Sequence, residues 1–201
     1  MEVIRDIEQG SEEWSRLRIA SIGGSSISKA VAGGQGKMRT QLLYDFVGEL
    51  LSGEKKNGYT NQFMEEGIKH EDSARKLYEF ETGHTVEQVA LILHDNPYFC
   101  VSPDGLINDD GMIEIKTVIP SVFVERKLTW CIPTDYRRQI QWSLFVAERQ
   151  WCDFVNYCPY LKDTYPLITQ RVLRDEKEIS ELQKGADLFI SEMLKMYEAV
   201  K

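Results

Sequence analysis

The stretch SPDGLINDDGMIEIKTV, residues 102–118, holds a turn signal between two strand-like runs. Asp109, Asp110 and Gly111 are typical of a tight turn between paired strands, so the stretch predicts a β-hairpin. Its second strand, residues 112–118, is largely apolar but carries Glu114 and Lys116. A carboxylate and an amine in such a strand indicate either a functional site or an ion pair on an exposed sheet edge.

The alternation of side chains along a strand puts this pair on one face of the predicted sheet. Met112, Glu114 and Lys116 share that face, and the two isoleucines between them share the other. The rise per residue separates Glu114 from Lys116 by about 6–7 Å. The hairpin can return Asp104, which precedes the turn, towards Glu114. Two carboxylates and a lysine can therefore converge at one edge of the sheet.

This group of side chains has the chemistry of a magnesium site. Mg²⁺ prefers oxygen ligands, uses one or two protein carboxylates and keeps several waters, and Mn²⁺ accepts the same ligands. A bound metal lowers the pKa of a water ligand and stabilises charge on a phosphate. Lys116 can orient or deprotonate the attacking water, or neutralise charge on the phosphoryl group. The alternative is an exposed ion pair, with Asp104 serving only the turn.

A further acidic side chain comes from the helix predicted over residues 61–82, which Gly83 would end. Glu71 lies in the apolar stripe of this helix, whose other members are Met64, Ile68, Ala74 and Tyr78. An acid within that stripe must find a partner or a metal, unless it lies at the margin. The neighbouring His70 is a metal-ligand type, but it points to a different side of the helix.

The remaining patterns predict helices on both sides of a set of strands. Ser11 caps a short helix through Arg18, a second helix runs from Ser25 to Ala32, and QGKMR, residues 35–39, forms a mobile basic loop. Further helices are expected at residues 42–52, 134–148 and from Asp175 onwards, and further strands at residues 86–93, 99–102, 151–158 and 167–173. We therefore predict an α/β (α+β) fold, one domain over residues 1–201, with a central mixed sheet flanked by helices.

The composition restricts the class of protein. The 201 residues are 42% hydrophobic, enough for one domain with a buried core. The net charge of −8 counts against a passive nucleic-acid coat, but not against an enzyme that confines positive charge to a groove. No apolar run is long enough to span a membrane and the N-terminus lacks the build of a signal peptide, so we expect a cytoplasmic protein. Reduced thiols are expected at the four cysteines, which lack zinc-site spacing: Cys100, Cys131, Cys152 and Cys158.

Taken together, the motifs resemble a known family. PDG followed by IEIK, residues 103–105 and 113–116, resembles the metal site of the PD-(D/E)xK nuclease superfamily. The chain is more specifically similar to the phage lambda exonuclease family, the YqaJ-type viral recombinases. Residues 8–27 resemble that family's N-terminal motif, residues 67–83 its acidic helix and residues 136–146 its Q-x-Q helix. The resemblance covers most of the chain, and four motifs in order are far more specific than an isolated E-x-K.

The resemblance implies a restriction-endonuclease-like core and a Mg²⁺-dependent 5′→3′ exonuclease. Such an enzyme digests one strand of linear double-stranded DNA and leaves a 3′ overhang for a single-strand annealing recombinase, inside a bacterial or phage-infected cell. The implied metal ligands are Asp104, Glu114 and the Ile115 carbonyl. Lys116 would activate the water and Glu71 would serve the metal or its water shell. The implied ligands of the 5′ phosphate are Arg18, Ser25 and Gln139.

Each of these side chains also has an ordinary structural explanation. Arg18 could form a surface salt bridge, Ser25 could cap the helix that it opens, and Tyr136 could belong to the core. Gln139 and Gln141 could lie on a solvated helix face. The same alternative, ordinary solvated surface, applies to the best candidates for phosphate contacts: Tyr136, Arg137, Arg138, Arg126, Lys127, Lys37 and Arg39.

The resemblance also implies an assembly. Members of the family form a ring of three subunits with DNA through the middle, so a homotrimer is expected. A ring would gather scattered basic residues around one channel, which would help to reconcile the net charge of −8 with DNA binding.

Two other functions compete with this interpretation. The chain could be a different nuclease of the superfamily, either restriction-like or of the Cas4 type with an iron–sulfur cluster; in the latter case four cysteines must gather at one site. It could also be a non-catalytic module that binds DNA ends. Release of nucleotides from linear duplex DNA, with and without Mg²⁺, separates the enzymes from the binding module, and circular plasmids separate an endonuclease from an exonuclease.

Overall fold

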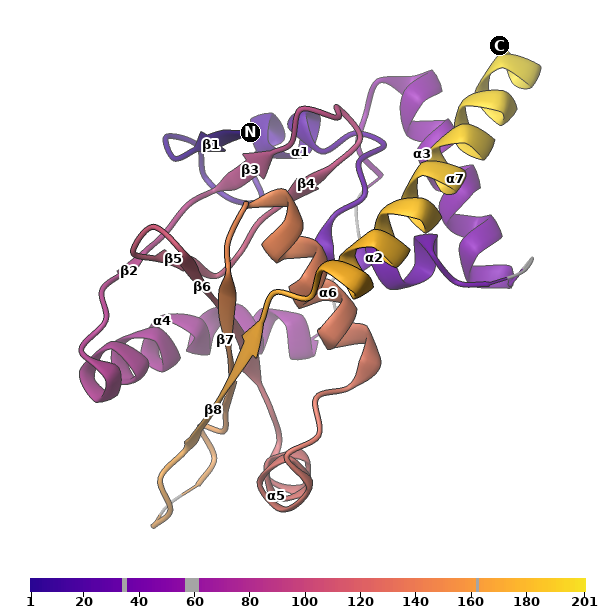
Figure 1. The fold of residues 1–201 in the computed structure, drawn as a ribbon. Coiled ribbons are helices and arrows are strands. Elements are labelled where there is room, and N and C mark those ends of the chain that lie inside the picture. The colour runs from indigo at the N-terminus through magenta and orange to yellow at the C-terminus, as the bar shows by residue number, and fades with distance from the viewer. Residues whose placement is uncertain (34–35, 57–61, 162) are drawn as a thin grey trace.

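The computed structural model describes residues 1–33, 36–56, 62–161 and 163–201, and the side chains of all of these except residues 62–68. Its centre is a five-stranded sheet in the order β2-β5-β6-β7-β8 (Figure 1). These strands span Val86–Glu87 (β2), Gly105–Ile107 (β5), Gly111–Thr117 (β6), Trp151–Tyr157 (β7) and Leu167–Leu173 (β8). β6 and β7 are parallel and the other neighbours are antiparallel, so the predicted central mixed sheet is confirmed.

Helices cover both faces of this sheet. The side chains of β6 point alternately to the two faces, as predicted, and a helix packs on each set. α4 (Gln62–Thr82) packs on one face, in a cluster that includes the two isoleucines of β6. α6 (Thr134–Val146) packs on the other face, where Met112 belongs to the main core. Figure 1 shows these two helices on opposite sides of the sheet. Glu114 and Lys116 follow Met112 in the alternation, so both face α6.

A second, three-stranded antiparallel sheet was not predicted. It has the order β1-β3-β4, and its strands span Glu2–Ile4 (β1), Leu91–Leu93 (β3) and Cys100–Val101 (β4). Residues 86–93, predicted as one strand, therefore divide between two sheets. Strands of two or three residues are too short to show an alternating pattern in the sequence.

The remaining helices are α1 (Glu12–Leu17), α2 (Gly24–Ala30), α3 (Lys37–Ser52), α5 (Pro120–Thr129) and α7 (Glu176–Val200). The predicted caps are confirmed: Ser11 Oγ accepts a hydrogen bond from Trp14 N, and Asp175 accepts from the first turn of α7. One prediction was wrong, because Lys37 and Arg39 open α3 instead of forming a mobile loop, and α5 was not predicted. Gln35 and Asn61, the first residues of the predicted loop and of the predicted long helix, lie outside the described residues.

The sequence indicated that Gly111 belongs to the hairpin turn, but in the structure this glycine starts β6. Ile107 pairs with Gly111, so the hairpin loop is formed by residues 108–110, with Asn108 in the left-handed region at φ 48°. A Cβ atom on Gly111 would lie 2.2 Å from Cζ2 of Trp151. The glycine is therefore required by the Trp151 ring that packs against the start of the strand.

We expect Gly111→Ala to lower the free energy of unfolding by about 1–3 kcal/mol, because overpacking forces Trp151 to move. Gly48→Ala is the matched control: Gly48 lies within α3, and nothing lies within 4 Å of an added Cβ. That change should be neutral or stabilising, since alanine has the higher helix propensity. Urea unfolding measures both variants, and an unchanged midpoint for Gly111→Ala would contradict the predicted overpacking.

Candidate active site at the edge of β6

The hairpin brings Asp104 to the edge of β6 beyond the point where β5 stops pairing with it. β5 pairs with β6 only as far as Ile113, while β6 continues to Thr117. Asp104 immediately precedes β5, and its Oδ2 accepts a hydrogen bond of 2.5 Å from the backbone N–H of Ile115. The carboxylate thus takes the place of a strand neighbour at this edge.

Glu114 is the buried centre of the group. Its side chain is only 3% exposed, and its Oε1 accepts hydrogen bonds from Lys116 Nζ at 2.5 Å and from Gln139 Nε2 at 2.6 Å. Lys116 Nζ also lies 5.3 Å from the centre of the Tyr136 ring, within range of a cation–π contact. Gln139 and Tyr136 both come from α6, so the helix that covers this face completes the surroundings of the strand pair.

The electrostatics of the group show an excess of negative charge. Burial and the neighbouring Glu114 raise the pKa of Asp104 well above its usual value, and Lys116 opposes them only in part. Burial alone would lower the pKa of Lys116, but the adjacent Glu114 and Asp104 outweigh it and raise that pKa. Two carboxylates thus share one ammonium group, an arrangement that a further cation would stabilise.

Glu71 of α4 approaches the same group and has a partner of its own. Burial raises the pKa of Glu71, the adjacent Arg75 opposes the rise and Glu114 adds to it. Arg75 Nη2 lies 2.5 Å from Glu71 Oε1, and the side chain of Arg75 is buried. Arg75 was not singled out in the sequence, although the spacing of four residues on a helix is a signal for such an ion pair.

The sequence also predicted an apolar stripe on α4 around Glu71 and singled out the neighbouring His70. The side chains of Met64 and Ile68, predicted members of its apolar stripe, lie outside the described residues, whereas Ala74 and Tyr78 are fully buried as predicted. The His70 ring lies 6.4 Å from the ring of Tyr157, centre to centre.

The donor atoms at the β6 edge suit a small divalent cation. Among the described residues no group of three or more His, Cys, Asp and Glu side chains is arranged to hold a metal. Mg²⁺ requires no such group, because it binds through one or two carboxylates and keeps its waters. Asp104 and Glu114 supply two carboxylates, and a bound cation would relieve their mutual repulsion.

The predicted phosphate ligands lie around Gly23 and Gly24, at the start of α2. The Arg18 guanidinium stacks 3.8 Å from the centre of the Trp14 ring, and a Cβ on Gly23 would lie 3.6 Å from its Nη2. A Cβ on Gly24 would lie 3.0 Å from Cγ of Gln139. These contacts place Arg18 beside Gly23 and Gln139 beside Gly24, and the close approach of Gln139 favours a residue without a Cβ at Gly24.

Two of the structural alternatives for these residues are wrong, those for Ser25 and Gln141. Arg18 forms no ion pair with any described residue. Ser25 is exposed and does not cap α2, because the cap is made by Ser26, whose Oγ accepts from Gly23 N at 2.9 Å. Gln141 does not lie on a solvated face: it is fully buried and bonds to Leu173 O and Asp175 N.

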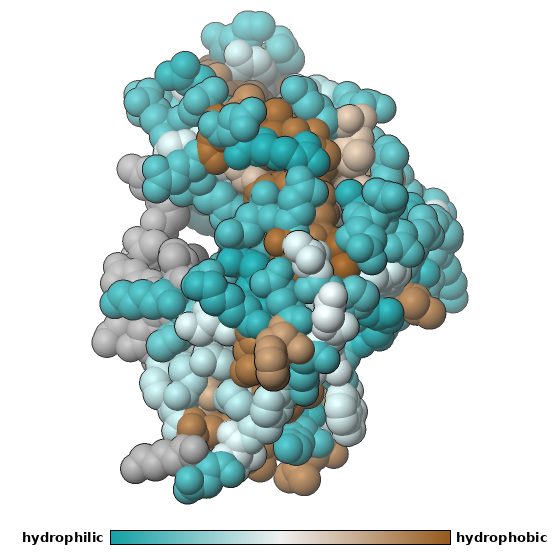
Figure 2. All heavy atoms as spheres, turned by 90° about the vertical axis from the view of Figure 1, so that its left-hand side faces the viewer, coloured by the Kyte–Doolittle hydropathy of each residue, from teal (hydrophilic) through white to brown (hydrophobic). Residues whose placement is uncertain are grey.

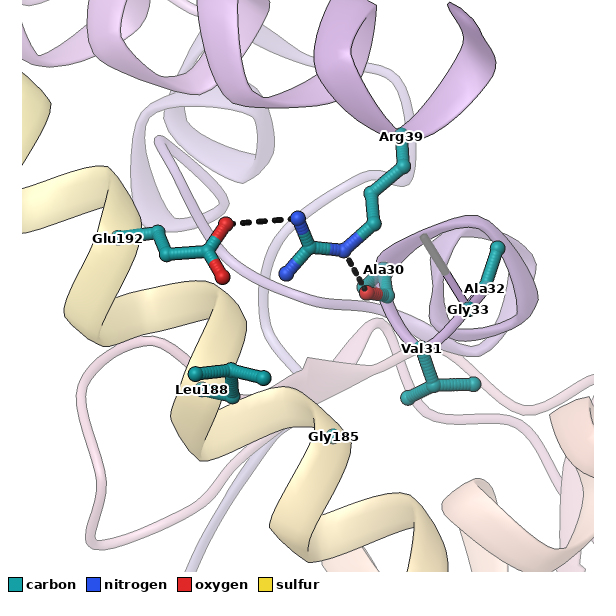
Figure 3. A pocket seen from close by; sticks show the side chains of 8 residues that line it. All are labelled: Ala30, Val31, Ala32, Gly33, Arg39, Gly185, Leu188 and Glu192. Atoms are coloured by element: carbon teal, nitrogen blue, oxygen red, sulfur yellow. Dashed lines mark hydrogen bonds and ion pairs between the residues drawn. The ribbon is translucent and has the colours of Figure 1, made fainter. Parts of the chain in front are cut away.

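Two of the basic residues predicted to contact DNA, Arg39 and Arg137, form ion pairs within the chain. Arg39 Nη1 lies 2.7 Å from Glu192, and Arg39 Nε donates to Ala30 O (Figure 3). This side chain is 11% exposed and lines a pocket of about 400 Å³ between α2, α3 and α7. Arg137 Nε lies 2.7 Å from Glu178 and lines a neighbouring pocket with Arg138. Neither pocket includes Asp104 or Glu114.

The other predicted cations lie on α3 and α5. Lys37 is exposed in the first turn of α3. Arg126 Nη1 donates to Cys131 O at 3.2 Å, and Lys127 is exposed on α5. Figure 2 shows a face of the molecule on which hydrophilic residues predominate, with hydrophobic residues visible in smaller patches between them.

All four cysteines are free, and three of them are buried. Burial raises the pKa of the Cys100 and Cys152 thiols, which keeps them protonated and unreactive. No group of three or more His, Cys, Asp and Glu side chains within the described part of the chain could hold a metal, so the cysteines do not gather as a Cas4-type cluster requires. No helix among the described residues is long and apolar enough to cross a membrane.

The mixed sheet with helices on both faces, and the acidic group with its lysine at the edge of β6, define a nuclease-like protein. Residues 13–150 match the YqaJ-like viral recombinase domain, and the chain belongs to this family. No match was found among curated proteins.

Solved structures agree with this family. An alkaline exonuclease, LHK-Exo from Laribacter hongkongensis, shares 30% identity and superposes with a TM-score of 0.87 over 94% of this chain and 96% of that one. The structure of LHK-Exo in complex with dAMP shares 31% identity with a TM-score of 0.88, over 95% and 96% of the two chains. A phage related exonuclease from Haemophilus somnus 129PT, at 12% identity and a TM-score of 0.67 over 90% and 96%, shares the fold. The family and the alkaline exonuclease structures support a nuclease.

Proposed function

We propose that this protein is a Mg²⁺-dependent 5′→3′ exonuclease that digests one strand of linear double-stranded DNA. The product would be a 3′ single-stranded overhang, the substrate of a single-strand annealing recombinase. The observation that carries the proposal is the convergence of Asp104, Glu114 and Lys116 at the edge of β6, in a chain similar to alkaline exonucleases. The complex of one such exonuclease with dAMP supports a nucleic-acid substrate.

The metal ligands in this proposal are Asp104, Glu114 and the carbonyl of Ile115. The Ile115 N–H points to Asp104, and the carbonyl of a strand residue points to the same side as its N–H. A bound Mg²⁺ would supply a water of lowered pKa and stabilise charge on the scissile phosphate. Lys116, beside Glu114, would orient that water or neutralise the phosphoryl oxygens, and Glu71 would accept hydrogen bonds from the water shell.

The first experiment is the release of nucleotides from linear duplex DNA labelled at either the 5′ or the 3′ end. We expect release with Mg²⁺ or Mn²⁺, none with a chelator, and early loss of the 5′ label only. Intact covalently closed circles should persist, because an exonuclease needs an end. Cleavage of the circles would favour a restriction-like endonuclease, and binding of ends without any release would favour the non-catalytic module.

A second proposal concerns the end of DNA that the enzyme recognises. Arg18 and Gln139 flank Gly23 and Gly24, and Ser25 is exposed beside them. The guanidinium group offers a planar fork of donors that fits a phosphate. We assign the terminal 5′ phosphate to these three side chains, of which Gln139 also contacts Glu114, a proposed metal ligand.

Duplex DNA with 5′-phosphate ends should therefore be digested faster than the same duplex with 5′-hydroxyl ends. Arg18→Ala should reduce this preference by about 10- to 150-fold, since a hydrogen bond to a charged group contributes about 1.5–3 kcal/mol. Arg16→Ala, on the exposed side of α1, is the matched control. The ratio of initial rates on the two substrates is the measurement, and an equal ratio in Arg18→Ala and wild type would show that another residue reads the phosphate.

We further propose a homotrimer, because gathering the basic residues around one channel would reconcile DNA binding with the net charge of −8. Light scattering should return three times the 23.2 kDa mass of one chain. Enclosed DNA cannot leave sideways, so an excess of unlabelled DNA added after the start should barely slow digestion. A mass of 23.2 kDa would refute the trimer, and an immediate halt on adding the trap would refute enclosure.

A further inference from the structure

Trp130 combines two features that are unusual in a surface residue. Its side chain belongs to the exposed large hydrophobics, with 59% of the residue accessible to solvent. Its backbone, at the C-cap of α5, is left-handed with φ 50°, a conformation that favours glycine or asparagine. A bulky residue held in this conformation with its ring in solvent indicates a role for the ring outside the fold.

The backbone of Trp130 is fixed from both sides. Its N–H donates to Arg126 O at 2.9 Å, and its carbonyl accepts from Gln170 Nε2 at 2.8 Å. The ring itself stacks on no other aromatic ring and no cation among the described residues. A ring presented on a fixed backbone loses little conformational freedom when a ligand binds to it.

The contact with Gln170 places the backbone of Trp130 on the same face of the sheet as the candidate active site. Glu114 of β6 pairs with Phe154 of β7, and Phe154 pairs with Gln170 of β8, so the three residues form one row across the sheet. Side chains of directly opposite residues share a face. Two strand spacings separate Gln170 from Glu114, or about 10 Å.

Cations and aromatic rings lie near Trp130. Lys127 is exposed on the same helix, whereas the side chain of Arg126 is 12% exposed, lies 3.6 Å from Glu125 and donates to the carbonyl of Cys131, the residue after Trp130. The ring of Tyr136 packs on Phe154, the middle residue of the row, with 5.6 Å between ring centres, and Lys116 Nζ lies 5.3 Å from the Tyr136 ring. Aromatic rings interleaved with cations beside a nuclease site are the features that bind single-stranded nucleic acid.

We propose that Trp130 is a stacking platform for an unpaired DNA base. The strand would be the one held at Asp104 and Glu114, and this part of the inference rests on the proposed nuclease function. Every base has a π-face, so the platform is independent of sequence and selects only for bases that are not paired.

The test is the affinity for a short single-stranded oligonucleotide, measured by fluorescence anisotropy without metal, so that nothing is cleaved. Trp130→Gly removes the ring and suits the left-handed backbone, so the variant should unfold at the same temperature as wild type or higher. We expect its affinity to fall about 5- to 150-fold, and that of Trp130→Phe to fall far less. Phe80→Ala, which removes an 88% exposed ring from α4, is the matched control and should bind as wild type does.

A scan of the oligonucleotide with single abasic positions assigns the contact to a base. One abasic position should weaken binding by wild type and leave binding by Trp130→Gly unchanged. Equal affinity of wild type and Trp130→Gly would overturn the proposal, and if that variant also lost oligomer mass, the ring would belong to an interface between copies. A wild-type protein that binds in this way without nuclease activity would contradict the proposed function and leave the platform in place.

Discussion

Asp104→Asn and Glu114→Gln should each reduce the digestion of linear duplex DNA by about 10³-fold or more. A carboxylate that holds the metal supports several kcal/mol of stabilisation of the transition state, and each 1.36 kcal/mol is a factor of ten in rate. In Asp104→Asn the amide oxygen of the new side chain can still accept from Ile115 N, so the hairpin should keep its geometry. The loss would therefore be chemical and not structural.

Two controls test whether the loss of activity is specific to the metal ligands. Asp109→Asn removes an exposed carboxylate from the loop of the same hairpin and should leave the rate unchanged. Calorimetric titration with Mg²⁺ should show binding to wild type and weakened binding to both site variants. If either site variant digested DNA at the wild-type rate, Asp104 and Glu114 would not be the metal ligands.

The parts of this site that lie on one hairpin could be predicted from the sequence, because they follow from local rules. The strand alternation put Glu114 and Lys116 on one face, and the turn returned Asp104 to the same edge. Even here the turn residues were misassigned by one position, because the packing of Trp151 on Gly111 acts across two strands that are far apart in the chain.

The parts that depend on helix–sheet packing could not be predicted. The resemblance assigned Gln139 to the 5′ phosphate, but nothing in the sequence indicated that its amide would donate to Glu114 from a helix 25 residues further on. Likewise, Arg39 was predicted in a mobile loop, whereas α3 begins at Lys37 and places Arg39 against Glu192 of α7. α5 was not predicted because Phe123 is its only buried residue, so the helix has no apolar stripe.

Lys116→Met should separate the binding of DNA from its hydrolysis. Lys116 Nζ is held between Glu114 Oε1 and the Tyr136 ring, so its position is set by the fold and not by the substrate. A charge held in place before the reaction stabilises the transition state more than the bound substrate. Methionine keeps the length of the side chain and removes only the ammonium group.

We expect the turnover number of Lys116→Met to fall about 10²- to 10⁴-fold, the range for a positioned proton-transfer or charge-stabilising group. The dissociation constant for duplex ends, measured with Ca²⁺ in place of Mg²⁺, should change little, because the proposed contacts to the phosphates are made by other residues. Lys195→Met, which removes an exposed ammonium group from α7, is the matched control for the loss of one positive charge. A variant that bound DNA as weakly as it digested it would show that Lys116 serves binding, and the assignment of this residue to the chemical step would then be wrong.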